Sequence, residues 1–221
     1  MKTTLALAAT LVAASNAVAQ DARASAPAAA STASARAIPS TDEVSLHPGA
    51  DYPAELVKAG VQGSVVVLVT IGAEGNPADA TIQQTSRSAP LDDAALAYVR
   101  SAIRLGSAAH PAPPQVLVPL RFTKDSLRTL ADKTCADFAV DATWFRATFP
   151  EKTLRDMPVV NMSVGALVLK QPMASARMMA IARHSNAAEA DATLAACTAH
   201  PDDRFLATLS RVVDDAVAKD R

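Results

Sequence analysis

Few residues in this chain could take part in chemistry, and the two cysteines stand out first. Cys135 and Cys197 are the only cysteines among 221 residues. An even cysteine count in an exported chain predicts one disulfide, and two buried free thiols are the alternative. A redox pair is disfavoured, because nothing near either cysteine in the sequence would lower a thiol pKa.

The four histidines do not form a metal-binding pattern. No His-x-x-x-His or Cys-x-x-Cys pair occurs, and the histidines are far apart in the sequence, at His47, His110, His184 and His200. The chain also lacks a Gly-x-Ser-x-Gly nucleophile motif and a glycine-rich phosphate loop. We therefore expect no catalytic residues, no metal, no cofactor and no enzymatic activity.

The first residues predict export. Lys2 precedes an uncharged apolar run, and the small residues Ala17-Val18-Ala19 follow it. This three-part pattern is typical of a secretory signal peptide, residues 1–19, cleaved after Ala19. The alternative is an uncleaved membrane anchor, which would need about 20 apolar residues.

Composition limits the partners and divides the chain. The formal net charge of −1 argues against a nucleic-acid partner, since phosphate binding needs a basic surplus. Aromatic residues make up only 4% of the chain, so its cores must consist mainly of aliphatic side chains. Residues 20–50 are rich in Ala, Ser, Thr and Pro without apolar periodicity, which predicts a disordered linker.

Residues 51–123 predict a small mixed unit that would position any binding surface. A short helix at 54–59 ends at Gly60, and a valine-rich strand at 64–71 follows, which we expect to be covered on both faces. A turn and an alternating stretch at 80–85 complete a hairpin. A helix then begins at Pro90, and its apolar face consists of Leu91, Ala95, Tyr98, Val99, Ala102 and Ile103.

A final strand is predicted at 115–123. Pro119 lies within it and has no amide proton to donate. The strand should therefore lie at a sheet edge or carry a bulge.

These pieces together resemble the TonB C-terminal domain family over about residues 52–122. The matching elements follow in the order Tyr52-Pro53, Gly60-Val61-Gln62-Gly63, the valine strand, Glu74-Gly75, Pro90-Leu91-Asp92 and Val118-Pro119-Leu120-Arg121-Phe122. The resemblance implies a short helix, a hairpin, a packed helix and an edge strand. It also implies that an extended partner segment adds to that edge strand, whose residues are Gln115, Val116, Leu117, Val118, Pro119, Leu120, Arg121 and Phe122.

The chain also departs from that family. Many relatives carry an aromatic Trp-Arg-Phe-Pro-like motif after the second helix, where this chain has Ile103-Arg104-Leu105-Gly106. The family's energy transducers keep the first apolar segment as an anchor that contacts inner-membrane motor proteins. We expect such a contact here only if the N-terminal segment stays uncleaved.

Residues 124–221 predict an all-α tail joined by the disulfide. Helices are expected at 126–140, 173–184, 186–198 and 203–219, with Pro150, Pro158, Pro172 and Pro201 as breaks. The strings Thr134-Cys135-Ala136-Asp137-Phe138 and 196–205 are similar to the disulfide-bearing ends of HdeA-like periplasmic acid-stress chaperones. A plain helical domain held by one disulfide is the alternative.

The predicted fold class is α+β, a small TonB-like domain at 51–123 followed by an all-α, disulfide-linked domain at 124–221. The predicted function is a periplasmic protein that binds an outer-membrane TonB-dependent receptor, or another envelope protein, by strand addition in support of energy-dependent transport. The alternative is a periplasmic chaperone or stress protein whose helical tail carries the activity.

Overall fold

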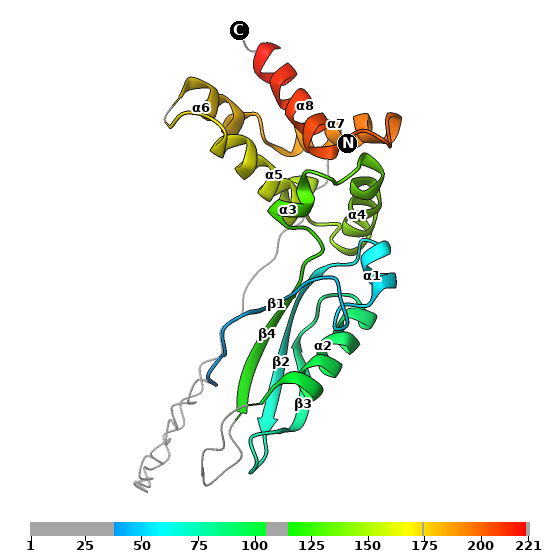
Figure 1. The fold of residues 1–221 in the computed structure, drawn as a ribbon, viewed down its shortest axis with the longest axis vertical. Helices are drawn as coiled ribbons and strands as arrows, with labels where there is room; N and C mark the ends of the chain where they lie inside the picture. Colours follow the sequence, from blue (N-terminus) through cyan, green and yellow to red (C-terminus); the bar gives the residue numbers. More distant parts are fainter. Residues whose placement is uncertain (1–37, 105–114, 174, 220–221) are drawn as a thin grey trace, which may run out of the picture. The chain divides into compact units, whose positions relative to one another are not determined.

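The structure, a computed structural model, describes residues 38–104, 115–173 and 175–219. The predicted signal peptide, residues 1–19, and the linker up to residue 37 lie outside the described residues. Figure 1 shows a sheet with its packed helix, followed along the chain by a helical region. This arrangement confirms the predicted α+β fold class.

Four strands form one sheet in the order β1-β4-β2-β3. The central strand β2 (Gly63–Ile71) pairs antiparallel with β3 (Pro77–Gln84) on one side and with β4 (Gln115–Phe122) on the other. The first strand, β1 (Val44–Leu46), runs parallel to β4. The predicted hairpin is thus present, and β4 lies inside the sheet.

Alternation along β2 defines the core of the sheet. Val65, Val67 and Val69 point to one face and are fully buried. The helix α2 (Ala89–Ala102) packs against β2 and β3 and buries Leu91, Ala95 and Val99. The prediction that β2 is covered on both faces is wrong, because α2 packs on the first face and the alternating side chains of the second face stay only partly buried.

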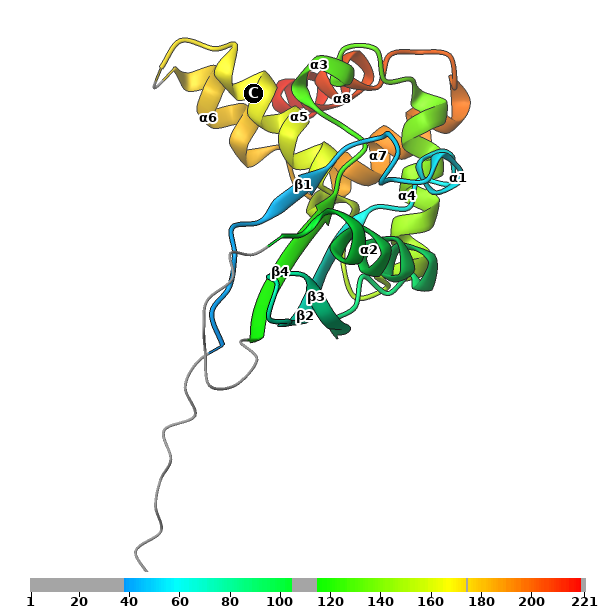
Figure 2. The same cartoon turned by 60° about the horizontal axis from the view of Figure 1, so that its bottom comes forward.

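The prediction that residues 115–123 form an edge strand is also wrong. Val44 lies beside Leu120, and an isolated bridge joins Ser40 to Leu117, so residues 39–46 cover the outer edge of β4. Figure 2 shows β1 beside β4 from a second direction. The sheet therefore ends at β1 and β3.

Pro119 still fits the physical reasoning that suggested an edge. The amide groups of Leu117 and Thr123 donate to Pro39 and Leu46, on the side away from β2. Amides of alternate residues point to the same side of a strand, so the missing amide proton of Pro119 also belongs to that outer side. The register between residues 39–46 and β4 shifts by one residue there, from Ser40–Leu117 to Val44–Leu120.

Part of the predicted disordered linker is ordered. Residues 38–50 are described, and they include β1. Leu46 is buried in the core of the sheet, and Val44 packs against that core on the same side of the strand. The prediction of disorder is wrong for these residues, because two apolar side chains two positions apart suffice to attach an extended segment to an available strand.

The short helix α1 (Ala54–Lys58) ends as predicted beside a glycine. Gly60 has a φ of +74°, a conformation that L side chains rarely adopt. The turn at this glycine brings the carbonyl of Val61 to the buried hydroxyl of Tyr52, which donates a hydrogen bond to it. The Tyr52 ring also packs edge-on against Phe122, with centroids 5.3 Å apart.

The region after β4 is helical, and its elements differ in part from the predicted ones. The helices are α3 (Leu127–Leu130), α4 (Cys135–Thr148), the 3-10 helix η1 (Leu154–Asp156), α5 (Pro158–Leu169), α6 (Ala176–Arg183), α7 (Ala187–Ala199) and α8 (Phe205–Lys219). The predicted helix at 126–140 is two helices, because Thr134 and Asp137 form a capping box that starts α4. Pro158 separates η1 from α5, as a break does, but the sequence did not predict the helix α5 that begins at this proline, where a first-turn proline gives up no helical hydrogen bond.

The helical region has its own apolar core, which contains the predicted disulfide. Cys135, at the start of α4, is bonded to Cys197 in α7, and both residues are fully buried. Phe138 of α4 stacks on Phe205 of α8 with ring centroids 4.2 Å apart. Covalent and aromatic contacts therefore join α4 to α7 and α8.

Candidate functional site

The outer edge of β4 is the surface that the sequence selected for partner binding, and the structure places a strand there. Thr41 donates its amide proton to the carbonyl of Leu117 at 2.9 Å, and Leu117 donates to Pro39 at 2.8 Å. Further along, Thr123 donates to Leu46 at 2.9 Å. We call residues 39–46 the covering segment. It meets the unpaired backbone groups of β4 as an added strand would.

One side-chain contact fixes the register of the covering segment. The Arg121 guanidinium binds both carboxylate oxygens of Glu43, with Nε–Oε1 2.8 Å and Nη2–Oε2 2.9 Å. Hydrogen bonding to Glu43 raises the pKa of Arg121 and keeps it charged. Both side chains are substantially exposed to solvent, so the pair selects a register more than it stabilises the fold.

A cleft of about 350 Å³ opens where the ends of β2 and β4 meet the helical region. Its walls include Arg87, Arg121, Trp144 and Phe149. Arg87 has a φ of +68° and pairs with Glu151 at 2.7 Å while lying over the Phe149 ring. The charges of Arg87 and Arg121 are both met by carboxylates of this chain, so the cleft has no uncompensated guanidinium to bind an anion.

A buried ion cluster joins the sheet to the helical region. Lys133 Nζ lies 2.8 Å from Asp125 Oδ1 and 2.6 Å from Asp141 Oδ2. Lys124 approaches the other oxygen of Asp141 at 2.7 Å. Burial opposes the charge of Lys133, but the carboxylates of Asp141 and Asp125 outweigh it and raise the Lys133 pKa. These contacts fix the connection between β4 and α4.

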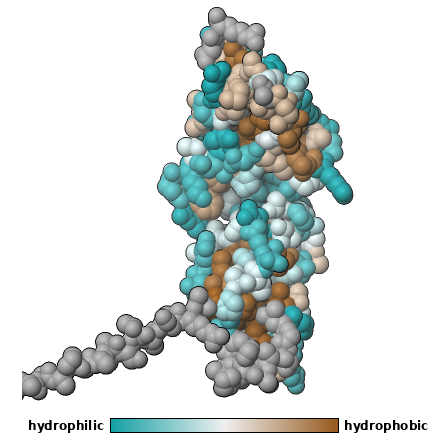
Figure 3. Space-filling view, turned by 90° about the vertical axis from the view of Figure 1, so that its left-hand side faces the viewer, coloured by the Kyte–Doolittle hydropathy of each residue, from teal (hydrophilic) through white to brown (hydrophobic). Residues whose placement is uncertain are grey.

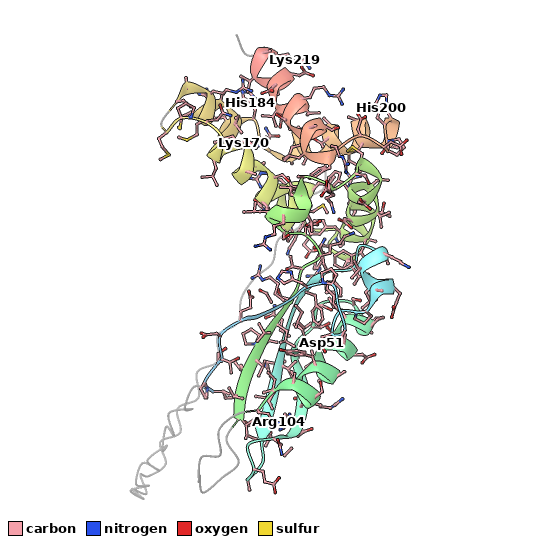
Figure 4. The ribbon with its side chains drawn as sticks, in the orientation of Figure 1. Asp51, Arg104, Lys170, His184, His200 and Lys219 are labelled. Atoms are coloured by element: carbon pink, nitrogen blue, oxygen red, sulfur yellow. A yellow bond between two sulfur atoms is a disulfide. The ribbon has the colours of Figure 1, made fainter. Side chains whose placement is uncertain are left out.

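The predicted residues separate into two locations. Gln115 to Phe122 all lie on β4, whereas Cys135 and Cys197 lie in the core of the helical region. No group of His, Cys, Asp or Glu side chains suited to a metal ion occurs within the described residues. Figure 4 shows His184 and His200 on separate helix ends, and His110 lies outside the described residues.

Sequence reasoning missed the covering segment and the ion cluster. The alternating apolar pair Val44 and Leu46 is a signal for a short strand, but the surrounding Ala, Ser and Pro residues concealed it. The partners of Lys133 are two carboxylates, each eight residues away in the sequence, and no local pattern connects all three. None of the helices in the described part of the chain has the length and apolar composition needed to cross a membrane.

Comparison with known proteins agrees with this geometry over one part of the chain. Residues 48–123 match the family described as Gram-negative bacterial TonB protein C-terminal. No curated protein and no solved structure matches the chain. The matched segment contains α1, β2, β3, α2 and β4 and excludes both the covering segment and the helical region. The chain therefore carries a TonB C-terminal domain at residues 48–123, as the resemblance of its motifs predicted.

Proposed function

We propose that this is a periplasmic envelope protein whose TonB C-terminal domain binds an extended segment of an outer-membrane receptor by strand addition. The outer edge of β4 would accept the segment, and the interaction would support energy-dependent transport across the outer membrane. The family match at 48–123 and the signal-like N-terminus support this assignment.

One observation carries the proposal. The outer edge of β4 is already paired with an extended segment, through backbone groups at both of its ends. A strand held in this way depends mainly on main-chain hydrogen bonds, which an extended peptide of another protein can also supply. The edge is thus shaped and oriented for strand pairing.

The proposal is tested with purified chain and fragments from the N-terminal ends of outer-membrane receptors of the same cell. The amide of Arg121 belongs to the outer side of β4, with those of Leu117 and Thr123. Arg121→Pro should remove that amide and abolish capture of the fragments, while leaving the β2 pairing intact. Arg121→Ala is the matched control, because it also loses the guanidinium but keeps the amide.

Circular dichroism must show that both variants remain folded. Capture that is lost in Arg121→Pro and retained in Arg121→Ala supports strand addition at this edge. Equal capture by both variants would exclude the outer edge of β4 as the contact.

A second candidate function, a chaperone activity of the helical region, is favoured by a different observation. Leu169, Met173 and Met179 are 80%, 86% and 55% exposed, around the connection between α5 and α6. Figure 3 shows apolar surface in its upper part, on the side where α5 and α6 lie in Figure 1. Exposed apolar side chains of this kind can bind unfolded clients.

The chaperone candidate requires that Leu169→Ser with Met173→Ser weakens suppression of client aggregation. Receptor-fragment capture should be unchanged in that variant. Suppression equal to that of the unchanged chain would remove this candidate.

A further inference from the structure

The strand that covers β4 comes from outside the TonB C-terminal domain. The family match begins at residue 48, whereas the covering segment ends at Leu46. The segment nevertheless occupies the outer edge of β4, the edge assigned above to a partner. A partner strand and the covering segment cannot pair with the same backbone groups at once.

The covering segment is attached by few contacts. Of its side chains only Leu46 is buried, and those of Thr41 and Val44 are half-buried. Glu43 contributes a solvent-exposed ion pair with Arg121. The missing amide of Pro119 and the register shift beside it interrupt the pairing in the middle. Segments with little buried surface and an interrupted ladder open locally at low cost.

The opposite edge of the sheet is a poor alternative for strand addition. The pairing of β3 with β2 contains two register irregularities, between Val66 and Val67 and between Thr70 and Ile71. The β3 strand also begins at Pro77 and carries Asp79. Bulges, prolines and charges are the features by which edge strands avoid pairing with other chains.

We propose that the covering segment is an exchangeable strand, and that a partner strand binds β4 by replacing residues 39–46. This inference rests on the proposed strand addition. It adds that the covering segment competes with the partner strand for the outer edge of β4. The closed form cannot bind, so the apparent dissociation constant of a partner exceeds its intrinsic value by the inverse of the open fraction. Any change that detaches the segment should then tighten partner binding.

The test uses a fluorescent peptide with the chain's own sequence from Ile38 to Pro48, so it needs no identified receptor. Thr41→Pro removes the amide that donates to Leu117 and should bind the peptide at least tenfold more tightly than the unchanged chain. Thr41→Ala keeps that amide and should behave like the unchanged chain. Hydrogen exchange should be faster at the amides of Leu117 and Thr123 in Thr41→Pro and unchanged in Thr41→Ala.

A second variant, at an exposed residue, keeps the proposal testable if Thr41→Pro does not fold. Glu43→Arg places two guanidinium groups in opposition at an exposed site and should also increase peptide affinity. Asp42→Arg makes the same change of charge one residue away, at a carboxylate that no ion pair of the described residues involves, and should not. Peptide affinities that are equal across all these proteins, or peptide bound by none of them, would overturn the exchange.

The two proposals fail in different ways. If the peptide binds only the opened variants but no receptor fragment binds any of them, the exchange stands and the proposed receptor function is wrong. If receptor fragments bind the unchanged chain and Glu43→Arg equally well, strand addition can stand but the covering segment is no competitor.

Discussion

Gly60 and Asp141 are in direct contact, although one lies in the TonB C-terminal domain and the other in the middle of α4. A Cβ atom placed on Gly60 would lie 2.8 Å from Asp141 Oδ1 and 2.9 Å from its Cα. The second distance involves helix backbone, which cannot move aside as a side chain can. The Gly-Val-Gln-Gly motif is therefore the place where α4 approaches the turn after α1.

Gly60→Ala should destabilise the protein by about 2 kcal/mol or more, because the substitution meets both a positive φ and a backbone contact. The φ of +74° alone disfavours any L side chain. Urea unfolding followed by circular dichroism measures the loss.

Gly165→Ala is the matched control for that substitution. Gly165 lies inside α5, and a Cβ there would meet nothing within 4 Å. Alanine should stabilise this helix by about 0.5–1 kcal/mol. If Gly60→Ala were as well tolerated as Gly165→Ala, the approach of α4 to the turn would be wrong.

Lys133→Met should cost about 3–5 kcal/mol, because it leaves the buried Asp125 without its cation and Asp141 with Lys124 alone. The Lys133 side chain is 3% exposed, and that of Asp141 is fully buried. Thermal or urea unfolding should show the loss at neutral pH.

The control for the lysine is an exposed ion pair between α4 and α7. Arg146 and Asp191 are 2.6 Å apart, but their side chains are 51% and 57% exposed. Arg146→Ala should cost no more than about 1 kcal/mol. A Lys133→Met protein as stable as Arg146→Ala would show that the ion cluster does not contribute to stability.

The TonB C-terminal domain was largely predictable because its signals are local. The alternation of β2, the glycine after α1 and the apolar face of α2 each lie within one short stretch of sequence. The pairing of residues 39–46 with β4 could not be predicted in this way. Pro119 correctly indicated a missing amide on the outer side of β4. No local sequence pattern indicated that residues 39–46 would pair with that side.

The helical region shows the same limit. The prolines indicate helix boundaries but do not say whether a helix ends or begins there, so α5, which begins at Pro158, is missing from the predicted helices. The predicted helix at 126–140 runs through Thr134, which instead caps the start of α4. The Cys135–Cys197 bond was predictable, since two cysteines allow one pairing.

Stability should fall above pH of about 10, through Tyr52 and Lys133 together. Burial first, and then the charges of Asp141 and Asp125, raise the pKa of Tyr52 above the ordinary tyrosine range. The pKa of Lys133 is raised as well. The folded chain therefore holds both protons more tightly than the unfolded chain, so this stabilisation is complete at neutral pH and is lost as the pH rises past the unfolded values.

The alkaline loss is measured by urea unfolding at pH 8, 10 and 11 in a Tyr98→Phe variant, where Tyr52 is the only tyrosine. Absorbance at 295 nm should report tyrosinate together with unfolding and not before it. A Tyr52 that ionises near pH 10 while the protein remains folded would contradict the prediction. The Tyr52→Phe variant should lose part of the pH dependence.

Removal of the disulfide should destabilise the helical region selectively. Cys135 and Cys197 are 62 residues apart in the sequence, and a loop of that length corresponds to about 4 kcal/mol in the chain-entropy treatment. Both cysteines lie in the buried cluster of the helical region, and the buried cluster of the sheet contains no cysteine. Amides of α4 and α7 should therefore lose hydrogen-exchange protection in a Cys135→Ala, Cys197→Ala variant, while those of β2 keep theirs.

A reducing agent should reproduce this pattern in the unchanged chain and add nothing to the variant. Mass spectrometry after alkylation of the native protein should find no free thiol. Two alkylated cysteines, or equal loss of protection in β2 and α7, would contradict a stabilising bond confined to the helical region.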